Sequence, residues 1–283
     1  MKVLIGIITR NRAELLPQAI QSALDQDYPE KEVVVLDIAS TDGTPAVRAQ
    51  FPQVRWIRSE ERLGIPESRN LLMSETDAAY FFSLDDDAWF LRHDEVALGV
   101  KFLEAHADYS VVAYDILLPG DQAKPERGQP RDTAIFIGCG HLLRLADVRQ
   151  VGFYAPNPTV YGGSEESDLS LRLYAGKKRV IFLPGVHVWH ERTNVGRDVL
   201  EQYKHNLCND LVALLRRCPL PDLLWMLPYR LLSHFRFALR RRWLRSYFVA
   251  LGLFARSLPS VLPSRDAVDA ASFRGFLKLR RSC

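Results

Sequence analysis

Three consecutive carboxylates, Asp85, Asp86 and Asp87, interrupt an otherwise apolar stretch, AYFFSLDDDAWFL, at residues 79–91. Carboxylate oxygens are ligands that the hard cations Mg²⁺ and Mn²⁺ take in proteins. Side chains alternate along an extended segment, so Asp85 and Asp87 are expected on one side and Asp86 on the other. A solvated acidic turn is the alternative, but the aromatic flanks favour burial. We therefore interpret the stretch as a buried strand that ends in a cation site.

A second group of acids, in GGSEESDLSLRL, follows two glycines and consists of Glu165, Glu166 and Asp168. Acids in the first turn of a helix can simply complement the positive end of its dipole. A carboxylate beside a partly dry pocket can instead have a raised pKa and act as a general base. A third element, HVWHE, places His190 beside Glu191, which indicates either a structural histidine or a metal or phosphate contact.

The sequence around these residues alternates by type in a way that predicts their scaffold. Continuous β-prone runs are typical of strands buried on both faces, and amphipathic runs between them are typical of helices. The pattern predicts an α/β fold with an open, mostly parallel sheet and helices on both faces. The expected strands are 2–9, 31–40, 54–60, 78–87, 109–117, 133–144 and 179–191, the expected helices 12–26, 44–51 and 66–76, and the expected loop 118–132.

Ligands of open parallel sheets bind at the carboxyl ends of the strands. The polar runs Thr9-Arg10-Asn11-Arg12, Asp37 with ASTDGT, ERLGIPESRN with Arg69, and the three aspartates follow the first four strands, so they are expected to converge at one edge. The sequence has neither a GxGxxG nor a GxxxxGK[ST] device for binding phosphates. A nucleotide bound here would therefore need a divalent cation, Mn²⁺ or Mg²⁺, between its diphosphate and the carboxylates.

The composition indicates a protein with a packed core and no membrane-spanning segment. The chain has 283 residues, of which 47% are hydrophobic, and this is ample for a packed core. Its four cysteines form no CxxC pair and its start shows no signal peptide, so a reducing, cytoplasmic location is expected. No uncharged apolar run reaches the roughly 18–20 residues that a bilayer span requires.

Near residue 198 the sequence becomes helical and basic, so we expect one domain over 1–197 and a basic helical region over 198–283. Residues 201–283 carry 15 Lys and Arg against 5 Asp and Glu, a net charge of +10, whereas residues 1–200 carry −7. Basic helices with interleaved aromatic residues suit an anionic membrane surface, which would make the protein peripheral on the inner face of the cell membrane. Packing on the acidic domain is the alternative, and no motif supports nucleic-acid binding.

From Val3 to about Arg192 the chain resembles the family 2 glycosyltransferases, which have the GT-A fold, and it is most similar to the bacterial branch with rhamnosyltransferase-like enzymes. The resemblance implies an inverting, metal-dependent transfer of a sugar from a nucleotide-diphospho-sugar to a hydroxyl of a glycan or lipid-linked acceptor, catalysed by the domain 1–197. It rests on ITRNR, ALDQDYPEKEVVVLDIASTDGT, RLGIPESRN, FSLDDDAW, GCGHLLRLADVRQVGFY and GGSEESDLSLRLYAGKKRVIFLPGVHVWH, in this order.

The resemblance also implies roles for single residues. Glu166 would be the catalytic base with Asp168 in reserve, and Asp87 would be the more direct metal ligand. The nucleotide-sugar site would comprise Thr9, Arg10, Asn11, Arg12, Asp37, Arg69, Asp85 and Asp86, and the Mn²⁺ or Mg²⁺ site Asp85, Asp87 and His190.

Two positions depart from the family pattern. Glu166 stands where Asp is usual, and LDIAST has Ile38 and Ala39 where Asn/Asp-Gly is usual after Asp37. Two other functions suit the expected sheet. A sugar-nucleotidyltransferase would need a G-x-G-T-R loop, which IITRNRAE lacks, and a non-catalytic nucleotide-sugar or glycan-binding protein would be expected to have lost some of the carboxylates.

Overall fold

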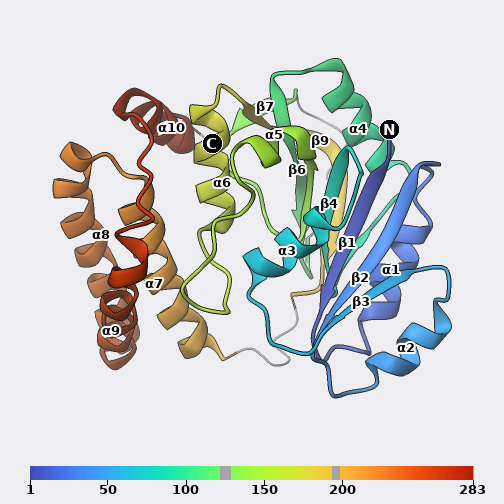
Figure 1. The fold of residues 1–283 in the computed structure, drawn as a ribbon, viewed down its shortest axis with the longest axis horizontal. Coiled ribbons are helices and arrows are strands. Elements are labelled where there is room, and N and C mark those ends of the chain that lie inside the picture. Colours follow the sequence, from blue (N-terminus) through green and yellow to red (C-terminus); the bar gives the residue numbers. More distant parts are fainter. Residues whose placement is uncertain (122–128, 193–197, 283) are drawn as a thin grey trace.

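The computed structural model describes residues 1–121, 129–192 and 198–282, and within this part of the chain nine strands form one mixed sheet (Figure 1). The strands are β1 (Val3–Thr9), β2 (Lys31–Ile38), β3 (Arg55–Ser59), β4 (Tyr80–Asp85), β5 (Ala88–Phe90), β6 (Tyr109–Leu117), β7 (Arg131–Thr133), β8 (Gly140–Arg144) and β9 (Arg179–His190). The helices are α1 (Leu16–Leu24), α2 (Thr44–Gln50), α3 (Ile65–Ser74), α4 (Glu95–Ala105), α5 (Leu145–Gln150), α6 (Glu165–Ala175), α7 (Val199–Arg217), α8 (Leu220–Arg241), α9 (Leu244–Val261) and α10 (Ala270–Ser282).

The sheet has the order β3-β2-β1-β4-β8-β6-β9-β5, with β7 paired to β9. Neighbouring strands from β3 to β4 are parallel, as are β6 and β9, whereas β8 runs antiparallel between β4 and β6. Thr9 lies opposite Asp37, and Ile8 lies opposite Asp85. The carboxyl ends of β1, β2 and β4 therefore meet at one edge of the sheet, as the sequence predicts.

The strand β1 is apolar throughout because its side chains enter two different cores. Ile5 and Ile7 pack on the face covered by α1 and α4, whereas Leu4 packs on the face covered by α3, α5 and α6. The expected arrangement of helices on both faces of the sheet is confirmed. The helical residues in these cores include Leu16, Ala19, Ile20, Val96 and Val100 on the first face, and Leu72, Met73, Val148, Leu169 and Leu173 on the second.

The strand expected at 133–144 is wrong in its extent. β7 ends at Thr133 and β8 begins at Gly140, and the residues between them are irregular. Side chains supply local hydrogen bonds in place of a ladder: Thr133 Oγ1 accepts from the Ile135 amide (3.1 Å), and His141 Nδ1 lies 2.9 Å from the Ile137 carbonyl. The segment 134–139 consequently reaches the edge of the sheet where β4 ends.

The C-terminal helices form a bundle that shares a core with the rest of the molecule. α10 and α7 pack against α6 through Phe273, Phe276, Leu214 and Leu171, and the bundle lies at the side of the sheet away from α1 and α2 (Figure 1). In the described ranges no helix is long and apolar enough to cross a membrane. The domain boundary expected after residue 197 falls at 193–197, which lie outside the described residues.

Candidate active site

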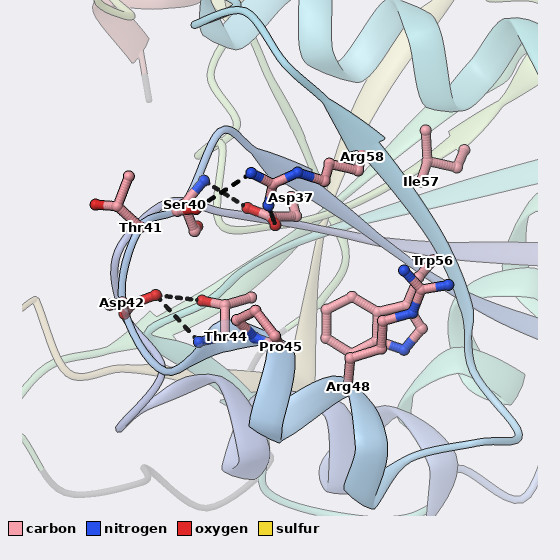
Figure 2. A pocket seen from close by; sticks show the side chains of 10 residues that line it. All are labelled: Asp37, Ser40, Thr41, Asp42, Thr44, Pro45, Arg48, Trp56, Ile57 and Arg58. Atoms are coloured by element: carbon pink, nitrogen blue, oxygen red, sulfur yellow. Dashed lines mark hydrogen bonds and ion pairs between the residues drawn. The ribbon is translucent and has the colours of Figure 1, made fainter.

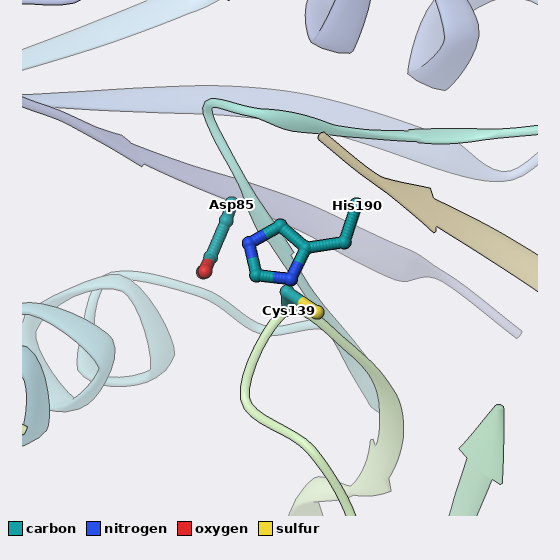
Figure 3. A group of neighbouring side chains, drawn as sticks. All are labelled: Asp85, Cys139 and His190. Carbon is teal, nitrogen blue, oxygen red and sulfur yellow. The ribbon is translucent and has the colours of Figure 1, made fainter. Parts of the chain in front are cut away.

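Strand pairing brings three chemically different side chains to the end of β4. Gly140 pairs with Leu84, so the residues just beyond the pair, Cys139 and Asp85, are neighbours. β5 pairs with β9, which places His190 opposite Ala88. The ligand atoms of Asp85, Cys139 and His190 all lie within 4.8 Å of one another (Figure 3).

This group fits a divalent cation. A carboxylate oxygen, a thiol sulfur and an imidazole nitrogen are all metal ligands, and an ion holds such atoms roughly 3–4 Å apart, within reach of small side-chain rotations. Burial and the nearby carboxylates of Asp85 and Asp87 raise the pKa of the Cys139 thiol well above its usual value. Asp87 is fully buried, and its Oδ1 lies 3.2 Å from His190 Nε2. Its role as the more direct ligand stays a prediction.

The three aspartates are arranged differently from the expected alternation. β4 ends at Asp85, and Asp86 and Asp87 form a turn before β5. Arg12 Nη1 lies 2.8 Å from Asp86 Oδ1 and 2.9 Å from Asp87 Oδ2. The prediction that Asp86 points away from Asp87 is therefore wrong, because a turn does not keep the side-chain alternation of a strand. Burial, opposed by the charge of Arg12, raises the pKa of Asp86 to about 6.

The expected catalytic base, Glu166, lies at the first turn of α6 and its side chain is 19% exposed. Arg69, which is buried, donates from Nη1 to Glu166 Oε1 at 2.7 Å, and its guanidinium lies over the Tyr154 ring at 5.4 Å from the centroid. A Cβ at Gly138 would stand 2.2 Å from Arg69 Nη2 and 2.6 Å from Glu166 Oε1. Gly138 thus lies against Glu166, and the next residue, Cys139, lies with Asp85 and His190 in the group that could hold a metal ion.

Two neighbouring acids on α6 have different surroundings. Burial and the charge of Glu166 raise the pKa of Glu165 to about 7, and Asn157 Nδ2 donates to its Oε2 at 3.4 Å. Asp168, the reserve base, is buried between two guanidinium groups at 2.7 Å each, those of Arg172 and Arg217. This arrangement ties α6 to α7 and engages both carboxylate oxygens of Asp168 in ion pairs.

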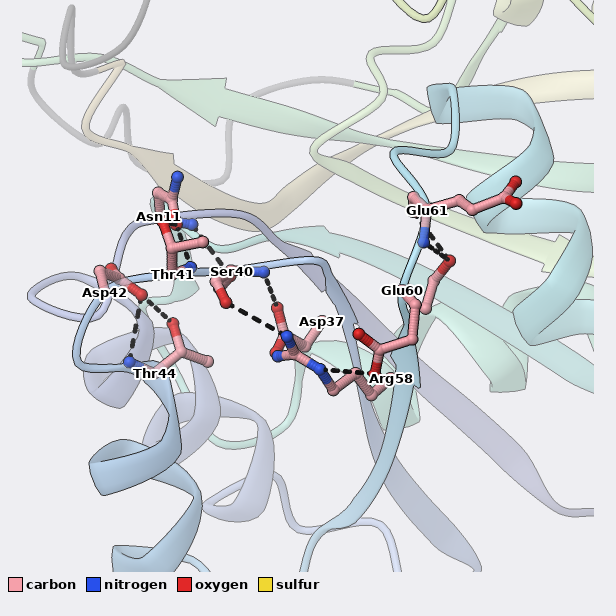
Figure 4. Close-up of polar contacts among 10 residues, drawn as sticks. Asn11, Asp37, Ser40, Thr41, Asp42, Thr44, Arg58, Glu60 and Glu61 are labelled. Atoms are coloured by element: carbon pink, nitrogen blue, oxygen red, sulfur yellow. Dashed lines mark hydrogen bonds and ion pairs between the residues drawn. The ribbon is translucent and has the colours of Figure 1, made fainter.

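The ends of β1 and β2 are joined by a polar network (Figure 4). Asn11 donates its amide to Ser40 Oγ (3.0 Å), and its Oδ1 accepts from the Thr41 amide (2.7 Å). Asp37 accepts from the Ser40 amide (3.0 Å) and from Arg58 Nη1 (2.6 Å). The sequence therefore uses ASTDGT to fix the two strand ends against each other. Ala39 has φ +50, which explains why glycine suits the turn after Asp37.

A cavity of about 330 Å³ opens beside this network, between α2 and β3 (Figure 2). Asp37, Arg58 and Trp56 are in its wall, with Arg48 and Thr44 from α2. Its volume lies at the lower end of the roughly 300–1,000 Å³ of ligand pockets, which suits part of a nucleotide-sugar rather than the whole.

The remaining expected residues differ in exposure. Thr9 is 1% exposed, whereas Arg10 is exposed. Sequence reasoning missed Cys139 and Arg58. The glycines on both sides of Cys139 were a signal of close backbone approach, but nothing in the sequence indicated that Arg58 would pair with Asp37.

Residues 4–147, just over half of the chain, match the family described as Glycosyl transferase family 2. The chain belongs to glycosyltransferase family 2. Its relatives include two Bacillus subtilis proteins named as glycosyltransferases. TuaG, named for teichuronic acid biosynthesis, is 27% identical over 124 residues, and EpsE is 32% identical over 124 residues. The matches cover 41% and 42% of this chain, and 48% and 43% of the relatives, so the chain spans about half the length of either.

Solved structures support the fold of this family 2 chain. The mannosyltransferase PcManGT from Pyrobaculum calidifontis, in complex with GDP-Man and Mn²⁺, aligns with a TM-score of 0.63 at 21% identity, over 91% of this chain and 75% of that one. TarS residues 1–349 from S. aureus, in complex with UDP-GlcNAc, align with a TM-score of 0.62 at 16% identity, over 100% and 91% of the two chains. The expected GT-A fold is confirmed.

Proposed function

We propose that this chain transfers a sugar, with inversion at the anomeric carbon, from a nucleotide-diphospho-sugar to a hydroxyl of a glycan or lipid-linked acceptor. The observation that carries the proposal is the short link between the two halves of the site. Gly138 packs against Glu166, and the adjacent Cys139 lies with Asp85 and His190. The segment 134–139 thus meets the proposed base through Gly138 and the proposed cation site through the next residue, Cys139.

Each half of the site has a distinct task in this reaction. Arg69 holds Glu166 through Oε1, so we assign the other oxygen to the acceptor hydroxyl, whose proton Glu166 takes as the hydroxyl attacks. Asp85 and His190 would hold Mn²⁺ or Mg²⁺, with Asp87 beside them. When bound, the cation supplies positive charge opposite the leaving diphosphate.

The cavity between α2 and β3 is the proposed place of the donor nucleoside. Asp37 offers a carboxylate in its wall, Arg58 and Arg48 offer cationic groups, and Trp56 offers an aromatic surface. These groups suit the hydroxyls and the ring of a nucleoside better than a bare sugar. PcManGT carries GDP-Man and TarS carries UDP-GlcNAc, which supports a nucleotide-sugar as the donor class.

We also propose that residues 1–197 carry the chemistry and that 198–283 present a surface to an anionic membrane, where a lipid-linked acceptor would lie. Apolar side chains on α8 are exposed at helical spacing, among them Leu224 at 81%, Tyr229 at 64% and Trp225 at 51%. The run 240–242 adds three exposed arginines at the end of the same helix. Apolar residues beside arginines are typical of helices that lie on anionic lipid.

A panel of nucleotide-sugars tests the proposed function. UDP-GlcNAc, GDP-Man and dTDP-rhamnose, the last for the rhamnosyltransferase-like sequence features, would be mixed with the full chain and Mn²⁺ or Mg²⁺. We expect one donor to raise the melting temperature and to release its nucleoside diphosphate, and EDTA to abolish that release. Metal-dependent binding without any release would support the non-catalytic binding protein instead, and formation of a nucleotide-sugar from a sugar phosphate and a nucleoside triphosphate would support the nucleotidyltransferase.

A further inference from the structure

Cys139 stands where the resemblance to family 2 leads one to expect only oxygen and nitrogen ligands. Its thiol lies with the Asp85 carboxylate and the His190 ring, each within 4.8 Å of the others (Figure 3). The three side chains come from three separate segments: the end of β4, the turn before β8 and the end of β9. In residues 1–121, 129–192 and 198–282 no second group of three His, Cys, Asp or Glu side chains is placed to hold a metal ion.

The backbone around Cys139 fixes the thiol in this place. A Cβ at Gly140 would stand 2.6 Å from Ile116 Cδ1, and one at Gly138 would meet Arg69 and Glu166. The segment is therefore pressed against its neighbours on both sides of the cysteine. Cys139 is itself 1% exposed. Its side chain has little room to turn away from Asp85 and His190.

A buried histidine braces the same turn. His141 is fully buried, and both of its ring nitrogens lie within hydrogen-bond distance of a partner. Because a carbonyl only accepts, Nδ1 donates to the Ile137 carbonyl (2.9 Å), and Nε2 lies 2.8 Å from the Tyr154 hydroxyl. The turn that carries Cys139 is thereby held from inside the fold.

We infer that Cys139 is a protein ligand of the divalent cation in this site, and that the set of one sulfur, one nitrogen and one oxygen makes the site prefer a borderline ion such as Zn²⁺ or Co²⁺ over Mg²⁺. Thiolate and imidazole ligands suit these ions, whereas Mg²⁺ takes oxygen ligands and keeps much of its water. Cation binding releases the thiol proton to solvent. The inference rests on the proposed function for the place of the cation, but not on the identity of the donor or acceptor.

The test uses Co²⁺ alone as a spectroscopic probe of the full chain, with no donor present. A thiolate bound to Co²⁺ gives a ligand-to-metal charge-transfer band in the near ultraviolet, which oxygen and nitrogen ligands do not give. We expect this band in the wild type, its absence in Cys139→Ser, and at least about tenfold weaker Zn²⁺ binding by Cys139→Ser in calorimetry, since even residues outside the first ligand shell contribute that much to metal affinity. We also expect one equivalent of Zn²⁺ to abolish the band and a large excess of Mg²⁺ to leave it.

The matched control has Cys208, Cys218 and Cys283 replaced by Ala, which leaves Cys139 as the one thiol of the sequence. It should keep the band, and it assigns the band to Cys139 even if Cys139→Ser fails to fold. The inference is overturned if the wild type binds no Co²⁺ or shows no band, if the band disappears in the control, or if Mg²⁺ displaces Co²⁺ as readily as Zn²⁺ does. Sugar transfer with Mg²⁺ by a protein that shows no Co²⁺ band would leave the proposed function intact and overturn only the role of Cys139.

Discussion

Arg12 balances two buried carboxylates at the end of β4. Its guanidinium lies within 2.9 Å of both Asp86 and Asp87, and both acids are at least 95% buried. Two buried negative charges without a positive partner would destabilise the fold. Burial already raises the pKa of Asp86 to about 6. The contact from the end of β1 to the turn after β4 therefore has a structural role, whatever ligand the site binds.

Replacement of Arg12 by Met tests this role. The variant leaves Asp86 and Asp87 without their shared cation, and we expect the free energy of unfolding to fall by about 3–5 kcal/mol, the cost of breaking a buried ion pair. Urea unfolding at neutral pH measures it. Arg10→Met, two residues away and exposed, is the matched control and should stay within about 0.5 kcal/mol of the wild type. Equal stability of the two variants would contradict the role.

The sequence predicts which residue types gather at this edge of the sheet, but not how they pair. The acids, Arg12 and His190 are all present at the predicted edge of the sheet. The partner of each acid depends on where a strand stops, and β4 stops at Asp85, two residues before the Asp87 that strict alternation would have to include. The sequence does not predict that Cys139 lies beside Asp85 either. The register of β4 against β8 brings the two together, and that register depends on contacts between residues far apart in the sequence.

Among the elements, α4 is fixed to the sheet by one buried acid at its first turn. Glu95 Oε2 accepts from the amides of Leu91 and Arg92 (3.1 Å each), and Oε1 accepts from the amide of His187 in β9 (3.1 Å). Burial raises the pKa of Glu95 to about 7, despite these three hydrogen bonds. The carboxyl therefore connects α4, the loop before it and β9.

The raised pKa of Glu95 predicts that the free energy of unfolding depends on pH. The pKa of Glu95 is higher in the folded state than its ordinary 4.5, so the folded state binds the proton more tightly. Its contribution to stability is complete below about pH 4.5 and is lost as the pH rises through 7. We expect the free energy of unfolding of the wild type, relative to Glu95→Gln, to fall by about 2–3 kcal/mol between pH 4.5 and pH 7.5. Urea unfolding at both pH values measures it, and parallel pH profiles would contradict it.

The first four strands and the three helices between them follow from the sequence because each run is long, apolar and bounded by polar turns. Residues 133–144 look equally β-prone, yet the structure breaks them at 134–139. The reason is contacts between residues far apart in the sequence: Gly138 packs against Glu166 at the start of α6, and Cys139 lies beside Asp85 at the end of β4. Local hydrogen bonds of Thr133 and His141 replace those of a strand ladder. The β-propensity of the residues alone does not predict those contacts.

The whole molecule has an asymmetric charge distribution, with −7 over residues 1–200 and +10 over 201–283. Both expected explanations have support in the structure. Arg217 reaches Asp168 on α6, so part of the positive charge is used in packing. The arginines at 240–242 instead lie exposed at the end of α8, together with its exposed apolar residues.

Sedimentation with vesicles tests the membrane surface. Replacement of Arg240, Arg241 and Arg242 by Gln should weaken binding to phosphatidylserine-containing vesicles by about 100-fold at low salt, since each basic residue contributes about 1 kcal/mol. High salt should weaken the binding of the wild type. The charge-matched control replaces Lys101, Arg149 and Lys177, which are exposed on the first part of the chain. No binding by the wild type at low salt, or equal loss in both variants, would contradict the proposal.

Glu166 is proposed as the base of a glycosyl transfer, and the variant Glu166→Gln tests this role most directly once a donor is known. Turnover and donor affinity would be measured in parallel with the neighbouring variant Glu165→Gln as control. We predict that Glu166→Gln lowers kcat by about 10²–10⁴-fold, because it removes general base catalysis, and that donor affinity changes by less than about threefold. Glu165→Gln should keep most of its turnover. Wild-type turnover by Glu166→Gln would show that Glu166 is not the base.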